Sequence, residues 1–401
     1  MKKNEIFMLA LFPLVLGSLF LSINFWSRVY ASPHPSQPIA QPVSPTPTPA
    51  PTTDATAHIQ VALLLDISGS MSGLIDQAKG KLWDIVNELA EARIGSKPTS
   101  LEIALYIYGA PHLGSHTGYT KRVVPLTTNL DLISQELFAL TTSGGDEYCG
   151  MVIQKAVTDL EWTSNPQDLR MIFIAGNESF GQGPVGYAQS TGNANERGIL
   201  VNTIFCGNAQ EGLNTGWAHG ATLGKGEYMN IDHNQRVTHV TTPYDAQISE
   251  YNSRLNDTYI YYGSQGKELK QRQEIQDSNA ESFGVGNIVK RGKSKVSSAY
   301  KNKNWDLVDA AEDDDFDMKK IDSETLPDTL QALNEAELKE YVEEKAEERA
   351  EIKKEINELY KKREEFVKTQ TTTTSTNQLD QAMIQAIRKQ GESKGMNFKK
   401  D

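Results

Sequence analysis

The chain has 401 residues, enough for two ordinary domains or for one α/β domain with long extensions. Its formal net charge is −12, from 40 Lys and Arg against 52 Asp and Glu, and no basic stripe runs along it. This composition argues against nucleic acid as the partner, because binding phosphate needs cationic side chains that displace counterions.

The first residues predict export. Lys2 and Lys3 precede an apolar run over 6–26, and small residues follow as far as Ala31. The segment 1–31 is therefore expected to be a signal peptide cleaved after Ala31 or, because the run is long, an uncleaved membrane anchor. Residues 32–56 are rich in Pro, Ser and Thr and predict an extended linker. The rest of the chain is expected in the periplasm or cell envelope, with possible anchoring in the inner membrane.

A buried strand followed by a polar loop opens the globular part. The unbroken apolar run of Val61–Leu65 ends in Asp66, Ser68 and Ser70, and 72–92 has apolar residues at helical spacing. The polar residues are therefore expected at the carboxyl edge of a sheet, where ligands bind in open α/β folds. One carboxylate and two hydroxyls suit a hard divalent cation. The alternative is a Ser/Gly turn that only caps the helix.

The segment Asp66-Ile67-Ser68-Gly69-Ser70 resembles the Asp-x-Ser-x-Ser signature of the von Willebrand factor A (VWA) domain family, whose loop is the metal-ion-dependent adhesion site. The apolar strand before it and the amphipathic helix after it agree with this resemblance. It implies an exported bacterial VWA-domain protein that holds a divalent cation. Mg²⁺ is favoured, and Mn²⁺ and Ca²⁺ are alternatives.

Two departures from the family pattern change the expected ligands. After the strand 101–108, the edge strand 121–126 and the helix 129–140, the loop 142–150 has Asp146 where the family has a coordinating Thr. The next strand, 170–175, ends in Gly176-Asn177-Glu178 instead of the family's Asp-Gly. The resemblance thus implies metal ligation by Asp66, Ser68, Ser70 and Asp146, with Glu178 acting through water. The alternatives are a helix-start acid for Asp146 and a surface acid for Glu178.

Helices and strands alternate through the rest of this region, with helices expected at 187–197 and 217–224 and strands at 199–205 and 227–231. The pattern predicts an α/β fold in which a doubly wound, mostly parallel sheet has helices on both faces. We place this VWA domain at 57–235 and expect a helical extension after it.

Cys149 and Cys206 are the only cysteines of a chain predicted to be exported, so a disulfide between them is expected. The bridge would fix the loop that carries Asp146. The alternative is two buried thiols that pack as small apolar groups.

Three segments follow the domain. Residues 236–322 predict a helical and partly loose extension, and 369–401 a flexible tail with a short helix. Between them, 323–368 has apolar and basic residues that recur four and three apart, separated by Glu and Lys. This periodicity is typical of a coiled coil or hairpin helix, which would allow self-association. A charged helix lying on the protein surface is the alternative.

No catalytic constellation is found, so no catalytic residue and no enzyme activity are expected. The favoured hypothesis is a binding module whose metal ion receives an acidic residue of a protein partner. The alternative is a structural envelope protein that interacts through its C-terminal helix, with the metal only stabilising the fold. Metal-dependent hydrolysis is the least favoured hypothesis, because Glu178 is the only candidate general base.

Overall fold

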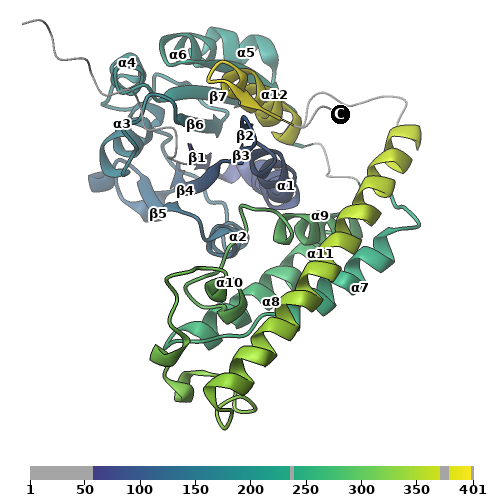
Figure 1. The fold of residues 1–401 in the computed structure, drawn as a ribbon. Coiled ribbons are helices and arrows are strands. Elements are labelled where there is room, and N and C mark those ends of the chain that lie inside the picture. Colours follow the sequence, from purple (N-terminus) through teal and green to yellow (C-terminus); the bar gives the residue numbers. More distant parts are fainter. Residues whose placement is uncertain (1–56, 235–238, 371–378, 399–401) are drawn as a thin grey trace, which may run out of the picture. The chain divides into compact units, whose positions relative to one another are not determined.

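The computed structural model describes residues 57–234, 239–370 and 379–398 (Figure 1). The predicted export signal and linker, 1–56, lie outside these ranges. Within them, no helix combines the length and the apolar character needed to cross a membrane.

A six-stranded sheet forms the centre of the α/β part. Five strands run parallel, and the edge strand β5 pairs antiparallel with β4. The strand order is β5-β4-β1-β6-β7-β8, which reverses between β1 and β6 as in doubly wound sheets. The predicted fold class is therefore confirmed. The strands are β1 (His58–Asp66), β4 (Ser100–Tyr108), β5 (Thr120–Thr127), β6 (Leu169–Gly176), β7 (Leu200–Cys206) and β8 (Lys225–Ile231).

Helices cover both faces of this sheet because its strands are apolar on both sides. Along β1, Val61, Leu63 and Leu65 belong to the core on one face, whereas Ala62 and Leu64 belong to the core on the other. The first face is covered by α1 (Ser72–Ala90), α2 (Leu130–Phe138) and α12 (Leu379–Glu392). The second is covered by α3 (Cys149–Asp159), α4 (Tyr187–Glu196) and α6 (Trp217–Leu223), with the short α5 (Ala209–Asn214) before α6.

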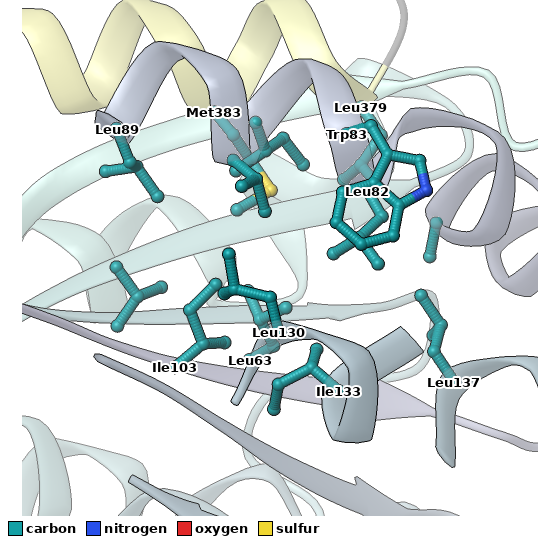
Figure 2. Close-up of a cluster of buried hydrophobic side chains, with 14 of the residues drawn as sticks. Leu63, Leu82, Trp83, Leu89, Ile103, Leu130, Ile133, Leu137, Leu379 and Met383 are labelled. Carbon is teal, nitrogen blue, oxygen red and sulfur yellow. The ribbon is translucent and has the colours of Figure 1, made fainter. Parts of the chain in front are cut away.

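The core under α1 is closed by a helix from the far end of the chain. Figure 2 shows Leu379 and Met383 of α12 on the same face of the sheet as Leu63 and Ile103, together with side chains of α1 and α2. Gln390 of α12 also exchanges hydrogen bonds with Asn202 of β7, at 3.1 and 2.5 Å. The short helix predicted within the tail is therefore present, but it is packed in the core and is not part of a flexible segment.

The C-terminal end is also tied to the sheet's periphery. A small antiparallel sheet has the order β3-β2-β9, formed by β2 (Arg93–Ile94), β3 (Lys97–Pro98) and β9 (Met396–Asn397). The pairs Arg93 with Asn397 and Ile94 with Met396 hold the last described strand against the turn that follows α1.

The predicted disulfide is wrong. Both cysteines are free and buried. Cys149 packs in the core on the α3 side of the sheet, whereas Cys206 packs in the core on the α1 side. The sheet itself therefore separates the two sulfurs, and the thiols act as small apolar groups, which is the alternative left open by the sequence.

We expect the two thiols to be unreactive in the folded protein and reactive after unfolding. Each is about 1% exposed, and burial raises the pKa of both thiols, which keeps them protonated. Ellman's reagent should count two thiols in denaturant without reductant and essentially none under native conditions. A count of zero in denaturant would mean that a disulfide forms.

A helical region lies in sequence between β8 and α12. It consists of α7 (Asp245–Asn256), α8 (Gly266–Ser282), α9 (Val285–Lys295), α10 (Leu307–Ala311) and the long α11 (Glu335–Gln370). Apolar residues of α7, α9 and α11 join the same core that contains β1 and α1. The segment expected to be partly loose thus contains two ordered helices, α8 and α9, which dock on α2 and α1.

Arg291 of α9 is the polar centre of this docking. Its guanidinium is fully buried and lies 2.6 Å from Asp277 of α8 and 2.9 Å from Asp131 of α2. It also lies over the ring of Trp83 of α1, at 4.7 Å from the centroid. One cation therefore links four helices, two from the α/β part and two from the helical region.

The apolar seam of α11 is used within the chain. Its residues pack inside the protein, and its two basic members bind buried carboxylates: Arg349 pairs with Asp306 and Asp309, and Arg363 with Asp245. The coiled-coil interpretation is therefore wrong for this face, and the surface-helix alternative holds. Figure 1 shows α11 running beside α7. The buried residues are Leu338, Val342, Arg349, Ile352, Ile356, Leu359, Tyr360 and Arg363.

Candidate metal centre at the end of strand β1

Asp66 is the last residue of β1 and lies at the point where the strand order reverses. The strand is buried throughout, so its end brings the carboxyl group to the sheet edge without exposing it. Asp66 Oδ1 accepts a hydrogen bond from the Ser68 backbone at 2.7 Å, which fixes the turn. Asp66 Oδ2 is buried and has no hydrogen-bond partner among the described residues.

The two serines place their hydroxyls side by side. Ser68 Oγ lies 3.2 Å from Ser70 Oγ, and Ser70 Oγ accepts a hydrogen bond of 3.1 Å from the side-chain amide of Asn177. Asn177 directly follows β6, the neighbour of β1. The structure thus brings together three of the residues predicted from the signature, and it adds the side chain of Asn177.

The second loop meets the first through the backbone, since Ser143 N–H donates to the Ile67 carbonyl at 2.9 Å. Within this loop, Asp146 is exposed and its carboxylate interacts with the Tyr119 hydroxyl. The next residue, Glu147, is only 4% exposed and its carboxyl lies beside Asp66. The structure therefore places Glu147, and not Asp146, next to the signature residues.

Glu147 is held in this position by the chain around it. Its backbone N–H donates to the Gln182 side chain at 2.7 Å, and a Cβ added to Gly109 would lie 3.0 Å from Glu147 Cγ. Sequence reasoning weighed only the residue that follows the glycines. Asp146 and Glu147 are adjacent acids, and this was the signal in the sequence that Glu147 could be the metal ligand in place of Asp146.

Asp66 and Glu147 form a buried pair of carboxyls, in which the charge of Asp66 disfavours ionisation of Glu147. Burial raises the pKa of Asp66, and burial together with the nearby Asp66 charge raises the pKa of Glu147 further. Glu147 Oε2, like Asp66 Oδ2, is buried without a hydrogen-bond partner among the described residues. The raised pKa of Glu147 means that its carboxyl holds a proton in the absence of metal. A cation placed between Asp66 and Glu147 would displace this proton and offset the repulsion between the two carboxylates.

Glu178 is exposed and stands further out. Its charge contributes to the raised pKa of both Asp66 and Glu147, and its backbone carbonyl accepts a hydrogen bond from the Trp217 indole at 2.7 Å. The structure therefore puts Glu178 at the surface, close enough for its charge to act on both acids.

The donor set fits a hard divalent cation. Asp66 and Glu147 would supply carboxylate oxygens, and Ser68 and Ser70 hydroxyl oxygens, which are ligands that Mg²⁺ and Ca²⁺ prefer. No cluster of three or more His, Cys, Asp or Glu side chains with metal-binding geometry occurs in the part of the chain that the structure describes. An ion at this position would thus depend on the serine hydroxyls.

The Asp-x-Ser-x-Ser loop follows the first strand of a doubly wound sheet whose only antiparallel member is an edge strand. The fold is VWA-like. No family model matches the chain, and no curated protein matches it.

Solved structures that are similar to the chain include a VWA domain. The hypothetical protein BatB from Bacteroides thetaiotaomicron is 17% identical, with 55% of this chain and 99% of that chain covered and a TM-score of 0.33. The SpRpn10 VWA domain is 14% identical, with 44% and 88% covered and a TM-score of 0.32. Proximal thread matrix protein 1 from the mussel byssus is 13% identical, with 43% and 41% covered and a TM-score of 0.33. The match thus spans less than half of the mussel protein.

Gly109 is a close neighbour of the VWA-like loop, and replacing it with alanine should strain the site. Its φ is +86°, and a Cβ there would lie 2.6 Å from Asp66 Oδ1. We expect Gly109→Ala to lower the free energy of unfolding by about 1 to 3 kcal/mol, measured by urea denaturation.

Gly144→Ala is the matched control for this measurement. Gly144 lies in the second loop, has no positive φ, and a Cβ there would meet nothing within 4 Å. It should change the free energy of unfolding by less than about 0.5 kcal/mol. Equal effects of the two substitutions would contradict the packing of Gly109 against Asp66.

Proposed function

We propose that this chain is an exported binding protein whose VWA-like domain holds a divalent cation and captures a protein partner at the cell envelope. Asp66, Ser68, Ser70 and Glu147 would hold the ion, with Mg²⁺ favoured over Mn²⁺ and Ca²⁺. The observation that carries the proposal is a pair of buried carboxyl oxygens, Asp66 Oδ2 and Glu147 Oε2, that accept no hydrogen bond from any described residue and lie on two adjoining loops, the first of which also carries two serine hydroxyls.

An acidic residue of the partner is the expected recognition group, because a bound cation attracts a carboxylate. Two protein carboxylates would neutralise most of the charge of the ion. The ion should therefore be held firmly and attract the partner's carboxylate weakly, so that the surrounding loops contribute to recognition. The proposal of export rests on the positively charged, apolar N-terminal segment. This segment would be either a cleaved signal peptide or an anchor in the inner membrane.

The competing proposal, interaction through the C-terminal helix, has less support. The apolar and basic seam of α11 is occupied by residues of the same chain, which leaves its charged surface for a partner. Hydrolysis is also less favoured, because Glu178, the candidate general base, is exposed to solvent. We therefore propose a binding protein without enzyme activity.

Metal removal tests the proposal. In full-length protein treated with EDTA, added Mg²⁺ at about 100 times its Kd should stabilise the fold by about 2.7 kcal/mol, seen as a rise in Tm. Asp66→Ala should abolish this rise. Protein captured from an envelope extract by the immobilised chain should be lost both with EDTA and with Asp66→Ala.

Two outcomes would contradict the proposal at different points. A Tm that does not respond to Mg²⁺, Mn²⁺ or Ca²⁺ would exclude the metal site. A partner captured equally with and without EDTA, in a protein whose Tm does respond to metal, would favour the structural alternative in which the ion only stabilises the fold.

A further inference from the structure

An open cavity lies at the opposite end of the sheet from Asp66. It has a volume of about 580 Å³ and is formed where α3 leads into β6 and where α4 leads into β7. This volume is in the range of sites for small organic ligands. The charged and aromatic residues that line the cavity are Glu161, Trp162, Arg170, Glu196 and Arg197.

Arg170 is the unusual member of this lining. It is the second residue of β6 and only 8% exposed, yet it forms no ion pair with any described residue. Among the described residues its side chain makes one hydrogen bond, from Nη1 to the Thr163 carbonyl at 2.6 Å, and its buried Nε has no partner. A buried guanidinium without a counter-charge is costly, so such groups are usually paired with an anion.

Two acids at this end of the sheet, Glu102 and Asp168, are engaged with other groups. Gln60 pairs with Arg170 across β1 and β6, and its amide donates to Glu102 at 2.8 Å, one strand further on. Asp168 accepts the backbone N–H of His58 at 2.9 Å. Neither acid therefore pairs with Arg170, whose charge has no carboxylate partner in the part of the chain that the structure describes.

The cavity wall beside Arg170 is fixed. The Gln60 side chain accepts a hydrogen bond of 2.8 Å from the Thr163 backbone, and the Trp162 indole donates to the Ala156 carbonyl at 2.9 Å. Trp162 is half-buried, so part of it remains to contact a ligand. The wall thus combines a fixed aromatic residue with an unpaired cation.

The remaining charges select the kind of anion. Glu161, Glu196 and Arg197 are exposed, so two carboxylates and one further cation surround the opening. A ligand with two negative charges would be repelled by Glu161 and Glu196, whereas a single carboxylate directed at Arg170 would complete the missing pair.

We propose that this cavity binds an organic monocarboxylate with a planar apolar portion, the carboxylate pairing with Arg170 and the planar part lying against Trp162. The site is separate from the metal loop and does not depend on it. The ligand could be a free acid or the C-terminal carboxylate of a peptide, which share this chemistry.

Isothermal titration calorimetry on the full-length protein tests this site. Benzoate is the first probe, and EDTA is present throughout so that no metal at Asp66 can bind the carboxylate. We expect saturable binding to the unsubstituted protein and an affinity at least about tenfold lower in Arg170→Gln, which removes the charge. Arg122→Gln is the matched control, since Arg122 is exposed on β5 and donates to a carbonyl, that of Asp159. It should bind benzoate normally.

Further probes separate the ligand classes. Trp162→Leu should weaken benzoate more than acetate, and phosphate should bind more weakly than benzoate. The dipeptide Gly-Phe, compared with its amide, distinguishes a peptide terminus from a free acid. If Arg170→Gln does not fold, the Tm of the unsubstituted protein should still rise in benzoate relative to chloride at equal ionic strength. No saturable binding, no rise in Tm, or equal binding by Arg170→Gln would overturn the proposal.

Discussion

Replacing Arg349 with alanine is expected to lower the free energy of unfolding by about 3 to 5 kcal/mol, because the change leaves two buried carboxylates without their cation. The guanidinium lies 2.6 Å from Asp306 and 2.8 Å from Asp309, and it donates to the Thr258 carbonyl at 2.6 Å. It also stacks over Tyr259, at 4.0 Å from the ring centroid. Arg349 is 2% exposed, so water cannot replace these interactions.

Lys354→Ala on the same helix is the control. Lys354 is exposed, and its replacement by alanine should change the free energy of unfolding by less than about 0.5 kcal/mol. Urea denaturation followed by circular dichroism measures both variants, because α11 contributes much of the helical signal. A difference below about 1 kcal/mol between the two would show that α11 is not held by this buried ion pair.

Glu147→Gln is expected to weaken Mg²⁺ binding at least about tenfold, whereas Asp146→Asn should change it by less than about threefold. The two acids are adjacent, but only Glu147 is buried beside Asp66, and Asp146 is exposed at Tyr119. Both substitutions remove one charge and keep the shape. The comparison therefore separates a ligand from a nearby surface charge.

Calorimetric Mg²⁺ titration of both variants gives the affinities, and the Tm without metal serves as the folding control. Because burial and Asp66 raise the pKa of Glu147, its carboxyl favours the protonated form without metal, and Gln should not lower that Tm. A large loss of affinity in Asp146→Asn with little change in Glu147→Gln would return the ligand role to Asp146.

Patterns over short stretches of sequence predicted the strands, the helices and the first loop, because these depend on interactions between residues close together in the chain. An unbroken apolar run can be buried only inside a sheet covered on both faces, so β1 and the doubly wound order follow from such runs alternating with amphipathic helices. The shared location of three side chains, those of Asp66, Ser68 and Ser70, was predictable, because a short turn at the end of a strand restricts the directions in which its side chains can point. The burial of Arg349 and Arg363 was not predictable, because their partners lie tens of residues away in sequence.

The choice between Asp146 and Glu147 could not be made from sequence. In a loop without regular periodicity, backbone torsions decide which of two neighbouring side chains points inward, and here the bonds of Ser143 and Glu147 to Ile67 and Gln182 set them. The cysteines illustrate a related limit. A disulfide was expected, but the parity of residues along β7 and the position of α3 put the two cysteines on opposite faces of the sheet.

The sequence by itself determined the class of fold, the position of the first loop and the type of ligand that its oxygens suit, because these follow from hydrophobic periodicity and side-chain chemistry over short stretches. Only the tertiary structure decided that Leu379–Glu392 completes the α/β core and that the helical region from α7 to α11 is inserted before it. It also decided that Glu147 faces Asp66 and that Arg170 is buried without a counter-charge. Each of these depends on contacts between residues far apart in the chain, which no local pattern encodes.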